Sequence, residues 1–452
     1  MGMKPRRVNR RTFGKAVLAA SLSATVIPLR AHGQGAAANE RITVGMVGLG
    51  GMGMGHVRRF LQSPDVQVVA VCDVHKRHYR DMDRGKRGPC GREAAKAIVE
   101  DYYSDQTARG SFTGCAAYAD FRELCARDDI DVVVVATPDH WHALCTLEAL
   151  RNGKDVYCEK PLTHLFREGQ IVAEEVAKQK AIFQTGSQQR SDPGFRRCVE
   201  LVRNGHIGKL VRVEVGLPPG PSEAQGDASV TEPPAELDYD FWCGPSEILP
   251  YMRARHHRWW RFYRAYGGGN IMDWIGHHND IAHWGMGVER SGPIEVEAGG
   301  EWTPAAFEGY NTPVHYDIRC SYPDGGTSSI SDRHTLGVKW IGEDGWIWAD
   351  RGKSDASNRA MLADDFEVGP FAAYDSRNHV QNFLDGVRTR TECIAPAEIG
   401  HRSVTPGHLG YVSWEFGRKL RWDPKNETIF GDVEADRLLN HVDYRAPWKL
   451  PK

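Results

Sequence analysis

The stretch Arg41-Ile-Thr-Val-Gly-Met-Val-Gly-Leu-Gly-Gly-Met-Gly53 decides the fold of this chain. Its first half is a short apolar run with β-branched residues, which predicts a buried strand. Its second half contains the spacing Gly48-x-Gly50-x-x-Gly53, and residues 56–62 after it have helical character. A strand, a glycine-rich turn and a helix in this order predict a dinucleotide-binding turn, in which the helix N-terminus receives the phosphates.

Each glycine of this turn has a separate predicted role. Gly48 makes the tight turn, Gly50 lets the backbone approach a pyrophosphate, and Gly53 allows the helix to pack closely on the strand. Met52 lies inside the same turn and is expected to border the cofactor. A generic glycine-rich turn of an α/β protein is the alternative, and the flanking strand and helix argue against it.

The next expected strand, 66–73, ends on an acid. The carboxylate of Asp73 is therefore placed to accept hydrogen bonds from an adenosine ribose, which favours NAD as the cofactor. The neighbouring cations Lys76 and Arg77 can instead pair with a 2′-phosphate, so NADP stays open as the alternative.

Strand and helix patterns alternate up to about residue 190, which predicts an α/β Rossmann domain with a parallel, doubly wound sheet. Beyond it, strand-like pieces separated by Gly/Pro-rich turns predict an α+β domain with a mainly antiparallel sheet. We therefore divide the chain into a signal peptide, 1–38, a Rossmann domain, 39–190, and a substrate and oligomerisation domain, 191–452. Further expected strands are 131–137, 155–158, 181–185, 210–215, 314–321 and 346–349, and expected helices are 93–102, 118–127, 142–152, 167–180 and 271–284.

The first 38 residues have the layout of a signal peptide, with basic residues, the apolar run 16–29 and then small residues. The segment Asn9-Arg10-Arg11-Thr-Phe-Gly-Lys15 resembles a twin-arginine motif, which directs folded proteins to their export machinery. We therefore expect a periplasmic or otherwise exported protein that carries a tightly bound cofactor with it. The apolar run is too short for a membrane anchor, and no other segment is long and apolar enough to span a bilayer.

Composition is that of a soluble globular protein, with 41% hydrophobic and 26% charged residues among 452. The net charge of −2 gives no reason to expect nucleic acid or an anionic membrane as a partner. The 10 cysteines include no C-x-x-C pair, which argues against a structural zinc site or a thioredoxin-type motif. Cys72 and Cys158 lie in expected strands and are interpreted as core thiols.

Two motifs follow apolar strands of the first domain. Thr137-Pro138-Asp-His-Trp-His142 ends the run 131–137, and Glu159-Lys160-Pro161 follows 155–158. Ligands bind at the carboxyl edge of parallel sheets, so both motifs are expected to border the cofactor, with Lys160 as a candidate cation near the reacting oxygen. The alternatives are a helix-capping His142 and a surface Glu159–Lys160 neighbour pair.

A third motif lies in the second domain, where Gly267-Gly-Gly leads into an expected helix that carries Asp273 and His277. These two residues are one helical turn apart, so they share a face of the helix. An Asp beside a His is the usual way to orient an imidazole and keep it basic. We therefore expect His277 to be the catalytic acid/base, Lys160 to polarise the oxygen, and Asp273 to be an orienting or substrate-binding carboxylate.

In this order and spacing, the glycine turn and the three motifs resemble the glucose–fructose oxidoreductase and inositol dehydrogenase superfamily, Gfo/Idh/MocA. The run 378–452, with His401-Arg-Ser and Trp422-Asp-Pro, resembles the exported bacterial branch of that superfamily. The resemblance implies a Rossmann domain followed by an open antiparallel sheet, hydride transfer at a carbinol or ketone carbon of a sugar, glycoside or cyclitol, and homo-oligomers.

The chain departs from the usual superfamily pattern in two places. The usual Asn-Pro-x-x-x-His appears as Thr137-Pro-Asp-His-Trp-His142, and the usual single histidine of the second domain is the pair His277-His278. The resemblance places His277 at the catalytic position and leaves the role of His278 open.

Two other functions stay open at the level of sequence. Some exported members of the superfamily are glycosidases that oxidise a sugar carbon transiently, which needs an additional acid/base; Tyr263 and Tyr266 are candidates by position. A non-enzymatic cofactor-binding sensor is the other alternative, and the export signal and the intact Lys160 and Asp273 argue against it.

A metal site is also conceivable from the histidines alone. The second domain has neither an H-E-x-x-H motif nor a cysteine partner for them, so we expect no metal. The histidines considered are His256, His257, His277, His278 and His283.

Overall fold

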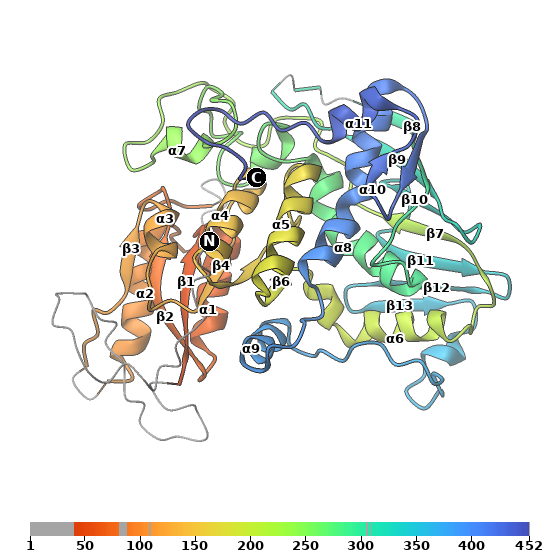
Figure 1. The fold of residues 1–452 in the computed structure, drawn as a ribbon, viewed down its shortest axis with the longest axis horizontal. Helices are drawn as coiled ribbons and strands as arrows, with labels where there is room; N and C mark the ends of the chain where they lie inside the picture. Colours follow the sequence, from red (N-terminus) through yellow and green to blue (C-terminus); the bar gives the residue numbers. More distant parts are fainter. Residues whose placement is uncertain (1–39, 81–87, 108–109, 304–305, 308, 452) are drawn as a thin grey trace, which may run out of the picture.

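The computed structural model describes residues 40–80, 88–107, 110–303, 306–307 and 309–451. The predicted signal peptide, 1–38, lies outside these residues. The described chain forms a six-stranded sheet and a nine-stranded sheet, each covered by helices, and the two halves lie side by side (Figure 1). Within this part of the chain, we find no helix with the length and apolar character needed to cross a membrane.

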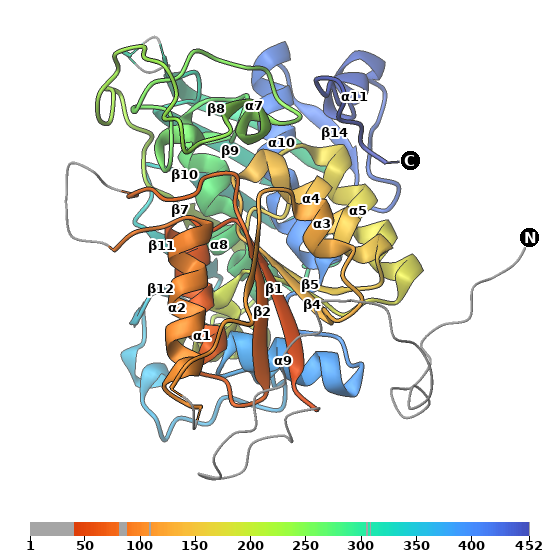
Figure 2. The same ribbon diagram turned by 90° about the vertical axis from the view of Figure 1, so that its left-hand side faces the viewer.

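The first sheet is parallel throughout, with strand order β3-β2-β1-β4-β5-β6. Helices α1, α2 and α9 cover one face and α3, α4 and α5 the other (Figure 2). The predicted Rossmann domain is therefore confirmed. Its elements are β1 (Ile42–Val47), α1 (Gly51–Leu61), β2 (Val66–Cys72), α2 (Arg92–Ser104), β3 (Ala116–Tyr118), α3 (Phe121–Cys125), β4 (Val132–Val135), α4 (Asp139–Arg151), β5 (Asp155–Cys158), α5 (Phe166–Gln179) and β6 (Phe183–Thr185).

Strand β3 is absent from the sequence-based predictions, which place a helix from residue 118. Ala116–Tyr118 instead pairs with Ala70–Cys72 of β2, and three residues are too short to give a recognisable alternation. Helix α3 starts only at Phe121, because the Asp120 side chain accepts a hydrogen bond from the Arg122 backbone N–H and so caps the helix.

The second sheet has the order β13-β12-β11-β7-β10-β9-β8-β14-β15, and β7 with β10 is its one parallel pair. The predicted mainly antiparallel sheet is therefore confirmed. Helices α6, α8 and α10 pack on the sheet around the fully buried Trp340. The elements are α6 (Pro193–Arg203), β7 (Leu210–Gly216), α7 (Tyr239–Cys243), α8 (Gly269–Met286), β8 (Glu295–Thr303), β9 (His315–Ser321), β10 (Thr327–Ser331), β11 (Gly337–Gly342), β12 (Trp346–Asp350), β13 (Lys353–Ala356), α9 (His379–Thr389), α10 (Ala397–Phe416), β14 (Leu420–Asp423), β15 (Thr428–Ile429) and α11 (Val433–Leu439).

Residues 218–268, between β7 and α8, return to the Rossmann domain, and we call them the strap. The Glu236 carbonyl accepts a hydrogen bond of 3.1 Å from the Lys76 backbone N–H. The Arg253 guanidinium donates a hydrogen bond of 2.7 Å to the Arg80 carbonyl. Helix α7, inside the strap, packs against α3 and α4 through Phe241. The strap thus covers the loop that follows β2.

The C-terminal part of the chain also contacts the Rossmann domain. Phe383 and Leu384 of α9 are fully buried in the same apolar cluster as β1 and α1. In the tail, the Trp448 ring lies 4.8 Å from the Trp141 ring of α4. The expected boundary at residue 190 separates the two sheets. Helix α9 and the C-terminal tail, although they follow this boundary, pack on the Rossmann domain.

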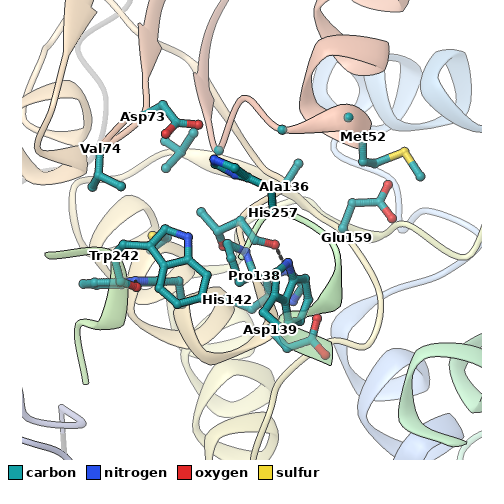
Figure 3. Close-up of a pocket in the computed structure, with 18 of the residues that line it drawn as sticks. Met52, Asp73, Val74, Ala136, Pro138, Asp139, His142, Glu159, Trp242 and His257 are labelled. Carbon is teal, nitrogen blue, oxygen red and sulfur yellow. Dashed lines mark hydrogen bonds between the residues drawn. The ribbon is translucent and has the colours of Figure 1, made fainter. Parts of the chain in front are cut away.

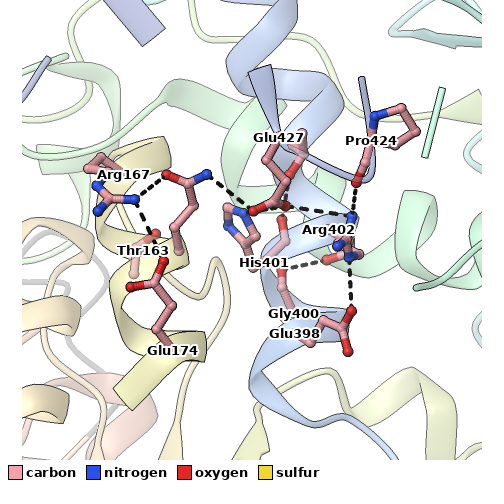
Figure 4. Close-up of polar contacts among 12 residues, drawn as sticks. Thr163, Arg167, Glu174, Glu398, Gly400, His401, Arg402, Pro424 and Glu427 are labelled. Atoms are coloured by element: carbon pink, nitrogen blue, oxygen red, sulfur yellow. Dashed lines mark hydrogen bonds and ion pairs between the residues drawn. The ribbon is translucent and has the colours of Figure 1, made fainter. Parts of the chain in front are cut away.

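A polar network ties α5 of the Rossmann domain to α10 and to the turn between β14 and β15 (Figure 4). Glu427 of this turn contacts His401 at 3.1 Å and accepts a hydrogen bond of 3.2 Å from Gln170 of α5. Arg402 donates a hydrogen bond of 2.8 Å to the Pro424 carbonyl. The His401-Arg402-Ser403 segment therefore anchors the C-terminal run to the rest of the chain.

Candidate active site

A pocket of about 370 Å³ opens where the glycine turn, the carboxyl ends of β2, β4 and β5, and the strap meet. Figure 3 shows Asp73 and Glu159 on opposite sides of this pocket, with Pro138 and His142 between them. The Rossmann residues that line it include Gly48, Gly50, Met52, Asp73, Thr137, Pro138, His142, Glu159 and Lys160.

The glycine turn has the geometry that each glycine was expected to supply. Gly48 has a φ of +84°, and a Cβ there would lie 2.5 Å from the Thr137 backbone nitrogen. A Cβ on Gly53 would lie 1.8 Å from the Gly48 carbonyl oxygen, so only glycine lets α1 approach β1. A Cβ on Gly50 would meet nothing within 4 Å, which leaves open space beside the backbone at the start of α1. This space fits a pyrophosphate.

Asp73 lies half-buried at the end of β2 and lines the pocket. Its carboxylate accepts hydrogen bonds from the backbone N–H groups of Leu49 at 2.6 Å and His75 at 2.8 Å. Burial raises the pKa of this carboxyl above its ordinary value, although the two backbone donors oppose the effect. Lys76 and Arg77 are exposed and do not line the pocket. The position of Asp73 therefore fits a role in holding a ribose.

We expect Asp73→Ala to weaken NAD binding more than NADP binding, because the carboxylate accepts from ribose hydroxyls and repels a 2′-phosphate. Fluorescence titration with both nucleotides measures the ratio of the two dissociation constants. Asp73→Asn is the control, since it keeps the shape of the side chain without its charge. An unchanged ratio in Asp73→Ala would show that the ribose assignment is wrong.

The motif at the end of β4 lines the same pocket as the glycine turn. The Thr137 hydroxyl is buried and has no hydrogen-bond partner among the described residues. Pro138 is the N-cap residue of α4. The ring nitrogens of His142 lie 2.7 Å from the Pro161 carbonyl oxygen and 3.1 Å from that of Thr137. His142 therefore joins the two strand-end loops, and the orphaned Thr137 hydroxyl is available to a ligand.

Glu159 is buried and is held by two polar side chains. One carboxylate oxygen lies 2.7 Å from His56 Nε2 of α1 and accepts a hydrogen bond of 2.9 Å from Gln188. Burial opposes ionisation of this carboxyl, but the His56 contact and the nearby Lys160 lower its pKa below the ordinary value. Glu159 therefore carries a negative charge close to Lys160. It does not form the surface ion pair with Lys160 that is the alternative reading of the sequence.

Lys160 forms its ion pair with the second domain. Its Nζ donates to the Asp273 carboxylate at 2.6 Å and to the Asp273 carbonyl at 2.8 Å. Arg261 of the strap approaches the same carboxylate at 3.1 Å. Burial opposes ionisation of Asp273, but the two cations lower the pKa of its carboxyl far below the ordinary range. Lys160 and Arg261 both line the pocket, so this cluster presents two cations to it.

His277 lies one turn after Asp273 on α8, half-buried, and it does not line the pocket. Its Nδ1 is buried and has no hydrogen-bond partner in the described part of the chain. The Asp273 carboxylate is engaged by Lys160 and Arg261, and no hydrogen bond to His277 is found in this part of the chain, so its orienting or substrate-binding role stays a prediction. Burial, together with Lys160 and Arg351, lowers the pKa of His277 well below its ordinary value, so its imidazole is neutral.

The neighbouring His278 faces the core of the second domain. It is fully buried, its Nδ1 lies 2.8 Å from the Gly216 carbonyl oxygen, and its Nε2 lies 3.6 Å from Asp350. These contacts tie α8 to the nine-stranded sheet, which gives His278 a structural position.

The two tyrosines considered as additional acid/bases do not reach the pocket. Tyr263 and Tyr266 are almost fully buried and are absent from the pocket lining. The Tyr266 hydroxyl donates to the Glu247 carbonyl at 3.0 Å and accepts from the Leu249 N–H at 3.2 Å. That prediction is therefore wrong: both rings belong to the aromatic core of the strap.

Asp139 is a pocket residue that the motif analysis did not single out. It is buried, lines the pocket, and has its pKa raised to about 8 by burial, against the opposing effect of Arg261. The position of Asp139 directly after Pro138, in a motif expected at the pocket, could have indicated it. Its burial could not be predicted, because an acid at a helix N-terminus is usually exposed. At neutral pH this carboxyl group is mainly protonated and can donate a proton.

We expect Asp139→Asn to flatten the pH dependence of stability. The folded-state pKa, about 8, exceeds the ordinary value of 3.8, so the folded chain retains a proton that the unfolded chain has lost. Asp139 therefore makes the free energy of unfolding fall as pH rises between these values. Thermal unfolding of both proteins from about pH 5 to 8 should show a Tm several degrees higher for the variant at the upper end. Parallel Tm profiles would contradict the assignment.

Comparison with known proteins agrees with this geometry. Residues 42–187 match the family model described as oxidoreductase family, NAD-binding Rossmann fold, and residues 201–450 match that described as oxidoreductase family, C-terminal alpha/beta domain. Inositol 2-dehydrogenase of Rubrobacter xylanophilus is 31% identical over 175 residues, 38% of this chain and 43% of that protein. Alpha-N-acetylgalactosaminidase of Shewanella oneidensis is 29% identical over 178 residues, 39% of this chain and 34% of that protein. The matched part thus spans less than half of either relative.

Solved structures share the fold of most of the chain. Aldose-aldose oxidoreductase from Caulobacter crescentus, in complex with glycerol, has a TM-score of 0.58 at 19% identity and covers 84% of this chain and 99% of its own. Myo-inositol dehydrogenase from Lactobacillus casei, in complex with NAD(H) and myo-inositol, has a TM-score of 0.55 at 18% identity and covers 85% and 97%. With both family models matched in order along the two sheets, the chain belongs to the Gfo/Idh/MocA family of NAD-binding oxidoreductases.

Proposed function

We propose that this protein is an NAD-dependent oxidoreductase that acts on a CH–OH group of a sugar, glycoside or cyclitol. The observation that carries the proposal is Lys160, which lines the pocket that also contains the glycine turn and is paired with Asp273 at 2.6 Å. It puts a fixed cation at the end of β5, on the same sheet edge as the nucleotide turn. The named relatives act on polyhydroxylated rings, which supports the substrate class.

The chain's own residues supply the proton chemistry. When bound, NAD accepts a hydride from the carbinol carbon. Lys160 is placed to stabilise the negative charge that develops on the substrate oxygen. His277 lies one helical turn after Asp273 on α8 with an unpartnered Nδ1, and we assign it as the acceptor of the hydroxyl proton. Asp273 accepts two hydrogen bonds from Lys160 and so holds its ammonium group in place, which makes Asp273 a positioning residue.

NAD rather than NADP, and tight retention of it, form part of the proposal. Asp73 faces the pocket, whereas Lys76 and Arg77 point to solvent. The strap is hydrogen-bonded across the loop after β2, at Lys76 and Arg80, and so covers the adenosine side of the pocket. A cover of this kind slows nucleotide release, and mass spectrometry of the freshly purified native protein measures retained nucleotide directly.

A glycosidase that oxidises a sugar transiently is the second candidate function. A specific observation favours it: Asp139 is a buried, mainly protonated carboxyl group in the pocket, which suits a general acid. Incubation of the protein with free sugars, cyclitols and glycosides, with and without added NAD, separates the alternatives. Net NADH formation supports the dehydrogenase, glycoside cleavage without added NAD supports the glycosidase, and neither reaction supports a sensor.

We further propose that the protein is exported by the twin-arginine route and assembles as a homo-oligomer. The basic, apolar and small-residue segments of 1–38 support export, and the paired residues Arg10 and Arg11 are its central feature. We expect Arg10→Lys with Arg11→Lys to leave the protein in the cytoplasm, as measured by cell fractionation and immunoblotting. Lys4→Arg is the control for a change elsewhere in the basic segment. Unchanged periplasmic delivery of the double variant would refute this route.

A further inference from the structure

Three histidines meet outside the Lys160–Asp273 pair. His75 and His78 follow β2, and His257 belongs to the strap. Each offers one ring nitrogen that lies within 4.8 Å of the other two. His78 and His257 also line the pocket. The cluster thus joins two segments that are far apart in the sequence, directly beside Asp73.

The spacing of the ring nitrogens approaches that of metal ligands. Zinc–imidazole bonds are about 2.0–2.1 Å long, which puts the nitrogens of two tetrahedral ligands roughly 3.3 Å apart. His75 Nδ1 and His257 Nε2 lie 3.0 Å apart. The His78 and His257 rings are stacked, with centroids 3.6 Å apart and planes nearly parallel, so these side chains must rotate out of the stack for both to point a ring nitrogen at one ion.

The cluster also contains unsatisfied nitrogens. His78 Nδ1 is buried and has no hydrogen-bond partner in the residues described, and neither ring nitrogen of the adjacent His256 has one. Buried polar atoms in native proteins are nearly always paired, so an orphaned ring nitrogen in a histidine cluster is a sign of a missing ligand. His257 also has a left-handed backbone, with a φ of +57°, which is uncommon for a residue other than glycine.

We propose that His75, His78 and His257 bind one divalent first-row metal ion, with Zn²⁺ as the ion that suits three neutral imidazoles. The fourth coordination position would face the pocket that His78 and His257 line. The ion would join the strap to the loop after β2 and so fix the cover over the adenosine side. This inference goes beyond the proposed oxidoreductase activity and does not depend on it.

The site differs from the one considered from sequence. His277, His278 and His283 lie on α8, away from the cluster, and only His257 is shared. His75 and His78 were not considered because a single histidine pair at a spacing of three in a loop carries no recognisable ligand pattern. Folding of the strap onto the Rossmann domain is what brings the third ligand to them.

The test loads chelator-treated, folded protein with Zn²⁺ by equilibrium dialysis at neutral pH and measures metal content by mass spectrometry. We expect one Zn²⁺ per chain in the wild type, and affinity lowered at least about tenfold in His78→Asn and in His257→Asn. Asparagine tolerates the left-handed backbone at residue 257, so this variant removes the imidazole without straining the turn. His441→Asn, an exposed histidine outside the cluster, is the matched control.

X-ray absorption at the zinc edge of the loaded wild type counts imidazole ligands, and it decides the question even if a variant fails to fold. A shell of three imidazole nitrogens supports the site. Absence of stoichiometric Zn²⁺ in the wild type, full binding by folded His78→Asn and His257→Asn, or a metal shell without these imidazoles would each overturn it.

Discussion

Lys160→Met is expected to lower turnover by at least about 10²-fold while NAD binding persists. The physical reason is that Lys160 Nζ, held at 2.6 Å from the Asp273 carboxylate, supplies the cation that stabilises the developing oxyanion. Methionine keeps the length and apolar stem of the side chain and removes the charge. His277→Ala is expected to cost about 10²–10⁴ in turnover, because it removes the proton acceptor. Steady-state kinetics and nucleotide titration measure both effects.

The controls distinguish chemistry from folding. Lys178→Met, at an exposed position on α5, should leave turnover unchanged. Lys160→Met leaves the Asp273 carboxylate paired with Arg261, so the folded state should keep a balanced ion pair and lose little thermal stability. Wild-type turnover in folded Lys160→Met would remove Lys160 from the reaction. Turnover loss in His277→Ala with a matching loss of thermal stability would assign it a structural role instead.

Gly50→Val is expected to abolish NAD binding. A Cβ at this position meets no protein atom within 4 Å, so the added side chain enters the open space that a pyrophosphate needs. The backbone of Gly50 has φ −73° and ψ −164°, an extended conformation that valine adopts readily. The variant should therefore fold, with nucleotide affinity as the property that changes.

Isothermal titration with NAD measures this effect, and thermal unfolding verifies the fold. Gly50→Ala provides a graded comparison, since its smaller side chain should weaken binding less. Gly53→Ala should instead destabilise the chain, because its Cβ would lie 1.8 Å from the Gly48 carbonyl oxygen. NAD binding by folded Gly50→Val at wild-type affinity would show that the phosphates do not lie at this turn.

The local patterns of the sequence predict most of the Rossmann domain. The run of β-branched residues in 41–47, the glycine spacing and the acid after the second strand specify β1, the turn and Asp73, because each rule acts over a few residues. The motif residues after β4 and β5 also lie at the pocket as expected, since parallel strands place their carboxyl ends at one edge.

Features that depend on distant parts of the chain could not be predicted in this way. Lys160 and Asp273 are 113 residues apart, so no periodicity reveals that Asp273 pairs with Lys160 and not with the adjacent His277. Asp139 is buried in a pocket that it lines together with the strap residues Trp260 and Arg261, more than 100 residues away in the sequence. The histidine cluster likewise exists only because the strap folds back onto the loop after β2.

Transfer of deuterium from a carbinol carbon to the nicotinamide ring tests the central claim most directly. The purified protein is incubated with NAD and sugars, cyclitols or glycosides deuterated at single carbinol carbons, and the nucleotide is then examined by NMR. The proposal predicts deuterium at nicotinamide C4 with at least one labelled substrate, and its loss in Lys160→Met. Conversion of a substrate with no deuterium reaching the nicotinamide ring from any of its labelled carbinol carbons would contradict it.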